Sequence, residues 1–107
     1  MQTHKLTIKG TVQGVGFRPF IYQLATKFSL YGTVLNGTEG VEIVVNASKD
    51  KLELFIQAIK SELPPLASID TLKVEQIEPK NFSDFQIIQT DSDGEKTVNI
   101  PPDISNL

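Results

Sequence analysis

The stretch from residue 10 to residue 20, GTVQGVGFRPF, combines closely spaced glycines with an arginine and a proline. Glycine allows backbone conformations in which several N–H groups point at one centre. The guanidinium of Arg18 is a planar, permanently charged fork that matches phosphate or carboxylate oxygens. If a helix begins here, its free N–H groups and its dipole also favour an anion. The stretch therefore predicts an oxyanion cradle, with phosphate as the expected occupant, made by Gln13, Gly14, Val15, Gly16, Phe17 and Arg18.

A structural interpretation of the same glycines stands beside this one. A Gly-x-Gly pair before a helix is often only a tight turn, and the glycines alone favour that explanation. The known nucleotide motifs do not support a site either. No Gly-Lys-Ser/Thr follows, as a P-loop requires, and Pro19 occupies the place of the third glycine of the dinucleotide pattern.

The composition limits which classes of function remain. With 107 residues, of which 39% are hydrophobic, the chain is predicted to form one domain with its own core. A net charge of -3 argues against a nucleic-acid partner, because phosphate contacts need clustered Lys and Arg. Cys is absent and His4 is the only histidine, which excludes disulfides, thiolate metal sites and His-dependent nucleophiles. No apolar run is long enough to span a membrane and no signal peptide is evident, so we expect a soluble, cytoplasmic protein without a membrane partner.

The elements that would position the cradle can be predicted from periodicity. A strand is expected from Lys5 to Gln13, with Leu6, Ile8 and Val12 on its apolar face and Gly10 among them. A helix is expected from about Pro19 to Leu30, because its apolar residues recur at helical spacing and proline suits the first helical position.

A hairpin and a second helix follow. Residues 33–36 and 41–46 are predicted strands joined by a turn at residues 37–40. Ser48 is the expected N-cap of the second helix, and Pro64-Pro65 is expected to end it. Two further strands are predicted at residues 69–77 and 85–89.

The resulting order, β-α-β-β-α-β, favours an α+β fold of the ferredoxin-like sandwich type. It predicts an antiparallel sheet with two helices on one face, the first strand in the middle, and a short extra C-terminal strand. Residues 1–90 would form the domain. Residues 91–107 have little periodicity and are predicted to be a linker or arm, in which residues 97–100 could pair at a sheet edge.

The string from Val12 to Arg18, VQGVGFR, resembles the signature of the acylphosphatase family. The segment GTVLN at residues 32–36, followed by Gly40-Val41-Glu42, is similar to the second motif of that family. The resemblance covers roughly residues 4 to 90 and implies the same ferredoxin-like fold. It also implies that Arg18 binds the substrate phosphate, that Asn36 positions the attacking water, and that no metal or other cofactor is needed.

A narrower resemblance is to the N-terminal domain of HypF-type hydrogenase maturation proteins, which are carbamoyltransferases. Arg18-Pro19-Phe20 and residues 63–70 match it, and residues 100–104 resemble the segment that leads there into cysteine-rich zinc motifs. This resemblance implies that the substrate is carbamoyl phosphate. It further implies that zinc-binding and transferase domains follow, and that the end product is the cyanide ligand of nickel–iron hydrogenases.

Several alternatives remain at this stage. Arg18 could be a surface arginine paired with a carboxylate, and Asn36-Gly37 could be a turn pair, since Asn-Gly is a strong hairpin signal. Ferredoxin-like folds also bind RNA, but this chain lacks the basic lead-in and the alternating aromatics of such motifs. The chain could also be a free-standing acylphosphatase, or a module that binds carbamoyl phosphate or phosphate without turnover.

Overall fold

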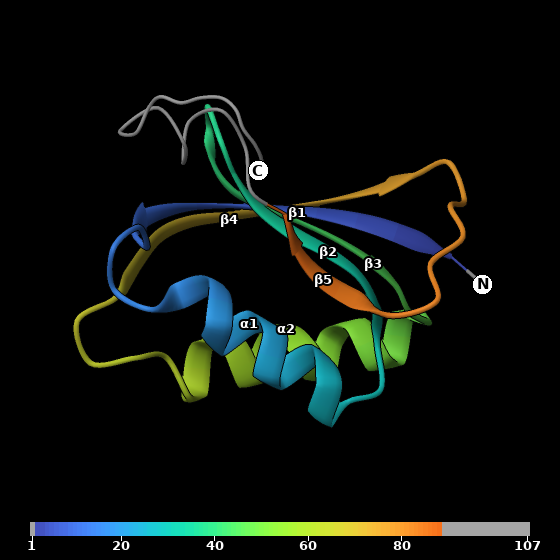
Figure 1. Ribbon diagram of the computed structural model, residues 1–107, viewed down its shortest axis with the longest axis horizontal. Coiled ribbons are helices and arrows are strands. Elements are labelled where there is room, and N and C mark those ends of the chain that lie inside the picture. Colours follow the sequence, from blue (N-terminus) through green and yellow to red (C-terminus); the bar gives the residue numbers. More distant parts are fainter. Residues whose placement is uncertain (1, 89–107) are drawn as a thin grey trace, which may run out of the picture.

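The computed structural model describes residues 2–88, which form two helices packed on one face of a five-stranded sheet (Figure 1). The strand order in the sheet is β4-β1-β3-β2-β5, so the first strand lies in the interior. This confirms the predicted ferredoxin-like sandwich. The elements in chain order are β1 (Thr3–Thr11), α1 (Phe17–Lys27), β2 (Tyr31–Gly37), β3 (Gly40–Asn46), α2 (Lys49–Ser61), β4 (Ser68–Ile77) and β5 (Phe85–Ile88).

The extra strand β5 is present, and it makes the sheet mixed rather than wholly antiparallel. It runs parallel to β2, with Phe85 opposite Gly32 and Ile88 opposite Leu35. The backbone N–H of Gly32 donates to the carbonyl of Asp84 at 2.9 Å, just before the strand begins. The ring of Phe85 is buried and lies 6.2 Å from the ring of Tyr22 on α1. Burial of Phe85 beneath α1 therefore holds β5 against the edge of β2.

The core lies between the sheet and the helices, and strict alternation in the central strands builds it. Every second residue of β3 is fully buried, as predicted, and the same face of β1 and the inner faces of both helices meet it. The ring of Phe28 at the C-terminal end of α1 packs edge to face against the ring of Phe55 on α2, with their centroids 6.4 Å apart. The strand contribution comes from Leu6, Ile8, Val34, Val41, Ile43 and Val45, and the helix contribution from Ile21, Leu24, Ala25, Leu52, Phe55 and Ile59.

The prediction that Gly10 belongs to the apolar face of β1 is wrong. Gly10 is exposed, and the pairing of β1 with β4 shifts register between Lys9 and Gly10, so that Asp70 becomes an extra residue. A side chain at Gly10 would place its Cβ 2.2 Å from the carbonyl oxygen of Ser68. Glycine is thus needed for the close approach of the two strands, and the irregularity changes the direction in which β1 leaves the sheet.

The start of the first helix also differs from the prediction. Helix α1 begins at Phe17, with Gly16 as the N-cap, so Pro19 is the third helical residue rather than the first. Proline is tolerated there because the N–H groups of the first turn have no intrahelical acceptor in any case. The N-cap of α2 is confirmed, since the Oγ of Ser48 accepts a hydrogen bond from the N–H of Lys51 at 3.3 Å.

The predicted linker at residues 91–107, with its possible strand at 97–100, lies outside the described residues. Among residues 2–88, neither helix has the length and apolar character that crossing a membrane would demand.

Candidate active site

The loop between β1 and α1 contains the glycines that suggested an anion cradle. Gly14 has φ 74° and Gly16 has φ 78°, both in the left-handed region. Val15 between them is not among the described residues with positive φ, so the sign of φ alternates along the loop. Alternation of this kind turns successive N–H groups toward one side and forms a concave anion-binding nest. Both glycines therefore have the left-handed backbone that such a nest uses.

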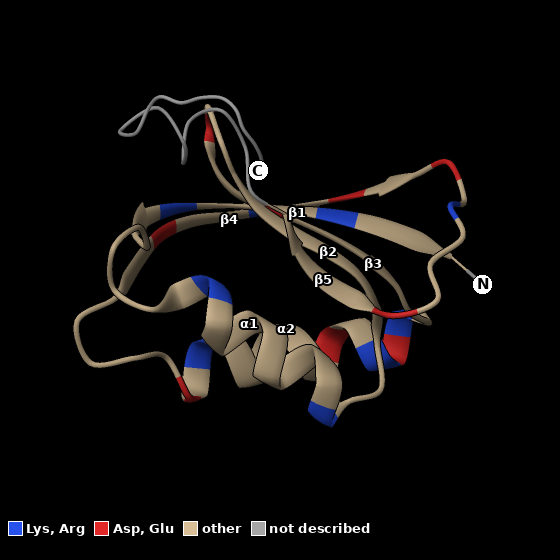
Figure 2. Ribbon diagram, viewed as in Figure 1, with Lys and Arg blue, Asp and Glu red and all other residues tan. Residues whose placement is uncertain are grey.

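The loop passes directly into the first turn of α1, which adds donors to the same place. Gly16, the N-cap, has no side chain to cap the helix, and the first turn contains no acidic residue. The only charged residues on α1 are Arg18 at its beginning and Lys27 at its end (Figure 2). Free N–H groups, the positive end of the helix dipole and a guanidinium thus gather beside the loop without a neighbouring carboxylate on the helix.

Burial of neighbouring side chains fixes the position of Arg18. Phe17 is almost completely buried in the core, and its ring lies 5.7 Å from the ring of Phe20. Val15 also packs against the core. The side chains of Phe17 and Val15 therefore serve packing, and Arg18 is half-buried between Phe17 and Phe20. Such anchoring limits how far the guanidinium and the loop N–H groups can move.

Asn36 lies on the helix-covered face of the sheet, at the same end as the loop. It pairs with Val41 of β3, which pairs in turn with Ile8 of β1. Ile8 is three residues, roughly 10 Å, before Thr11, the last residue of β1, after which the chain enters the loop. Asn36 is only 8% exposed, and its Oδ1 atom is screened from solvent. An amide in a row of apolar side chains is unusual, because burying a polar group costs free energy that an apolar side chain would not.

The interpretation of Asn36-Gly37 as a turn pair is wrong. Both residues belong to β2, Gly37 pairs with Gly40, and the two residues of the turn are Thr38 and Glu39. Turn formation therefore does not explain the choice of asparagine at this position.

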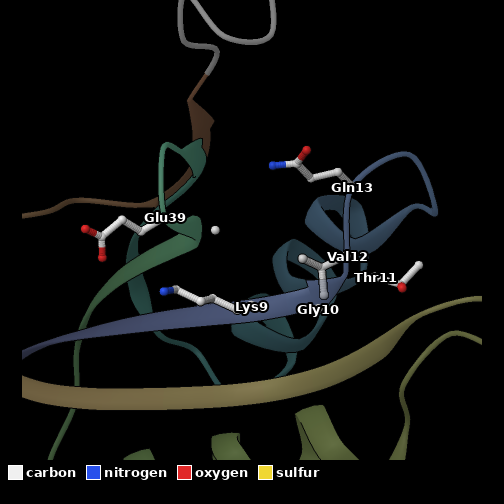
Figure 3. Close-up of a pocket in the computed structure, with 7 residues that line it drawn as sticks. Lys9, Gly10, Thr11, Val12, Gln13 and Glu39 are labelled. Atoms are coloured by element: carbon white, nitrogen blue, oxygen red, sulfur yellow. The ribbon is translucent and has the colours of Figure 1, made fainter.

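A pocket that the motifs did not indicate adjoins the loop (Figure 3). It has a volume of about 320 Å³ and lies between residues 9–13 and the β2–β3 turn, where Glu39 and Gly40 form its opposite wall. Sequence reasoning included Gln13 through the loop but missed Lys9 and Glu39. The available signal was weak: Lys9 is one of two lysines on the outward face of β1, and Glu39 is an acidic residue in a turn.

The structure thus places the predicted residues at one end of the sheet. The cradle loop and Arg18 follow the end of β1, Asn36 lies on the helix-covered face toward that same end, and Gln13 turns its side chain toward the adjoining pocket. The loop pattern suits a tetrahedral oxyanion, and the amide of Asn36 lies toward the same end of the sheet.

Comparison with known proteins agrees with this geometry. The model of the acylphosphatase family matches residues 4–87. A carbamoyltransferase HypF of Synechocystis sp. is 41% identical over 105 residues, which cover 98% of this chain but only 14% of that relative. An acylphosphatase of Pseudothermotoga lettingae is 40% identical over 89 residues, which cover 82% of this chain and 99% of the relative.

A solved structure has the same fold. The crystal structure of full-length HypF in the phosphate- and nucleotide-bound form superposes with a TM-score of 0.77 at 41% identity, over 81% of this chain and 12% of that one. The chain therefore spans about one-seventh of the length of the HypF relative it matches, and nearly the whole of a small acylphosphatase. The match over residues 4–87, on a fold with the same two motifs in place, shows that this chain belongs to the acylphosphatase family.

Proposed function

We propose that this chain hydrolyses acyl phosphates and that its substrate is carbamoyl phosphate. The observation that carries the proposal is the placement of Asn36, buried on the face and at the end of the sheet where the glycine loop and Arg18 also lie. Membership of the acylphosphatase family supports the reaction class. The identity shared with a carbamoyltransferase supports the choice of acyl group.

The chemistry needs positioning and charge neutralisation more than a strong base. An acyl phosphate is a mixed anhydride with a good carboxylate leaving group. The N–H groups of the loop and the guanidinium of Arg18 would hold the phosphoryl oxygens. Asn36 would hold a water in line with phosphorus through its amide. Attack by the water oxygen forms the new P–O bond, and the bond from phosphorus to the acyl oxygen breaks.

The products balance without a cofactor. The leaving carboxylate, which is carbamate when the substrate is carbamoyl phosphate, retains the electron pair of the broken bond. One proton of the attacking water passes to a phosphoryl oxygen of the substrate, and inorganic phosphate leaves. The protein contributes binding and orientation, and the proton acceptor belongs to the substrate.

In a longer protein, this reaction would be the first step of a transfer. We propose that residues 1–90 form the acylphosphatase-like domain and that residues 91–107 connect it to zinc-binding and transferase domains. Those domains would activate carbamate and lead to the cyanide ligands of nickel–iron hydrogenase. The proposal is supported by the HypF relative, of which this chain covers 14%. A free-standing acylphosphatase is the second candidate, since a relative of that kind is covered over 99% of its length.

The test is phosphate release from carbamoyl phosphate and from benzoyl phosphate, measured with a chelator present. Wild type is compared with Arg18→Ala and Asn36→Ala, and the exposed Lys27→Ala and Asn81→Ala serve as matched controls. We expect wild type and both controls to release phosphate and both site variants to lose at least about a hundredfold in kcat/KM. Faster turnover of carbamoyl phosphate supports the HypF-type assignment, and no preference supports a free-standing acylphosphatase.

Binding measured on the same proteins separates catalysis from simple binding. Asn36→Ala should still bind inorganic phosphate, because the cradle remains, while its turnover is lost. A folded wild-type protein that binds phosphate and releases none from either substrate would refute the hydrolase proposal in favour of a binding module.

A further inference from the structure

The pocket beside the loop adjoins the residue at which the predicted phosphate cradle begins. Its floor is the end of β1, one wall is Gln13, and the other is the turn at Glu39 and Gly40 (Figure 3). Gln13 is also the first residue of the cradle loop. A ligand whose phosphoryl group sits in the loop would have this pocket beside it, with Gln13 between the two.

The polar side chains of the pocket suit a small group that both donates and accepts hydrogen bonds. The amide of Gln13 points across the pocket toward the β2–β3 turn, and the side chain of Lys9 extends toward the same turn from below (Figure 3). A primary amide side chain supplies a carbonyl acceptor and N–H donors, whereas a lysine ammonium supplies donors only. The carboxylate of Glu39 is directed away from Gln13, so it contributes negative charge at the rim (Figure 3).

We infer that this pocket is the subsite for the acyl group, and that Gln13 determines acyl specificity. The inference rests on the proposed function. Gln13 would use its side-chain carbonyl to accept a hydrogen bond from the NH₂ group of a carbamoyl substrate. Lys9 would donate to the acyl carbonyl, which every acyl phosphate has. The backbone of Gln13 would thus begin the phosphoryl cradle, while its side chain would recognise the acyl group.

Selectivity follows from what each acyl group offers to the two residues. A carbamoyl group satisfies both Lys9 and the acceptor of Gln13. An acetyl group of nearly the same shape presents a methyl group to Gln13 and leaves that acceptor without its bond. A site built to hydrogen-bond a substrate N–H discriminates against an analogue that lacks it. Because the pocket is open to solvent, we expect a discrimination of about tenfold rather than the larger factors of closed sites.

The test uses two stable ligands that differ only in that group. Phosphonoacetamide and acetonylphosphonate replace the scissile P–O bond by P–C, and they carry NH₂ and CH₃ respectively on the carbonyl. Their dissociation constants are measured by titration calorimetry with the 107-residue chain. Wild type should bind the amide about tenfold more tightly. Gln13→Met should bring the ratio of the two constants close to one, whereas Lys9→Met should weaken both ligands by a similar factor.

Two further variants make the assignment falsifiable. Gln57→Met is a matched control on the exposed face of α2 and should retain the wild-type ratio. Glu39→Gln tests the other wall of the pocket. If the preference survives in Gln13→Met, or disappears in Glu39→Gln instead, Gln13 is not the specificity residue. Circular dichroism of each variant checks that the fold is retained.

The outcomes also separate this inference from the proposed hydrolysis. Wild type that prefers phosphonoacetamide but releases no phosphate from carbamoyl phosphate would refute the hydrolase proposal while supporting the subsite. Wild type that releases phosphate but binds both ligands equally would refute the subsite alone. Wild type that binds neither ligand would overturn both the subsite and the phosphoryl cradle.

Discussion

The glycines of the cradle loop and the glycines of the sheet should respond very differently to alanine. Gly16 has φ 78° and ψ 19°, and a Cβ added there would meet no heavy atom of the described residues within 4 Å. Gly40 has φ 132°, and a Cβ there would lie 2.4 Å from the carbonyl oxygen of Ile8 and 3.1 Å from its carbonyl carbon. The first substitution strains only its own backbone, whereas the second also collides with a central strand.

The two effects can be estimated separately. The left-handed conformation costs an L-residue about 1–2 kcal/mol, and the smaller conformational freedom of alanine in the unfolded chain offsets about 0.5 kcal/mol. Gly16→Ala should therefore lower the free energy of unfolding by about 1 kcal/mol, which corresponds to about 5 °C in Tm. Gly40→Ala should lower it by at least about 3 kcal/mol, because the overlapping atoms are backbone and cannot rotate away.

Urea and thermal unfolding followed by far-UV circular dichroism measure both values, since the chain has no tryptophan to serve as a fluorescent probe. Gly14→Ala is an internal replicate of the loop substitution, because Gly14 has φ 74° and equally open surroundings. The reasoning is refuted if Gly16→Ala is as destabilising as Gly40→Ala, which would mean that the loop is packed rather than open. It is refuted equally if Gly40→Ala costs less than about 1 kcal/mol.

Two further substitutions test the scaffold. Ser48→Ala removes the side-chain acceptor that caps α2 and should lower the free energy of unfolding by about 1 kcal/mol in chemical denaturation. Ser61→Ala, in the last turn of the same helix, should have a smaller effect. Equal effects of the two substitutions would contradict the capping role. Phe55→Ala removes a fully buried ring that packs against Phe28 and should cost about 3–5 kcal/mol; a loss below about 1 kcal/mol in the same assay would show that the core is not packed as described.

Local patterns in the sequence were sufficient to predict most of the scaffold. Alternation in residues 41–46 and helical spacing in α2 report directly which side chains face the core, so these elements are confirmed with small changes at their ends. The start of α1 was predicted too late, because Pro19 was taken for the first helical residue. The left-handed conformation of Gly16 sets the start instead, and it depends on the whole loop.

Features that depend on pairing between distant segments were not predictable in this way. The parallel pairing of β5 with β2 and the register shift at Gly10 arise from how strands meet, and no pattern within either strand encodes them. The same is true of Asn36. The sequence places it in a predicted strand, but only its register opposite Val41 sets it in line with Ile8 of β1. The pocket with Lys9 and Glu39 likewise exists only because the end of β1 and the β2–β3 turn meet.

The direction of β5 decides at which end of the sheet its last residue lies. Because β5 runs parallel to β2, Ile88 lies opposite Leu35, the neighbour of Asn36. An antiparallel strand in the same place would instead have ended opposite Gly32, roughly 10 Å farther from Asn36 along the sheet. The last described residue of β5 therefore lies toward the end of the sheet at which Asn36 is found. If a second enzyme domain were joined to this end of the sheet, the connecting segment could be short. The effective concentration of that domain near a product leaving this site would then be high.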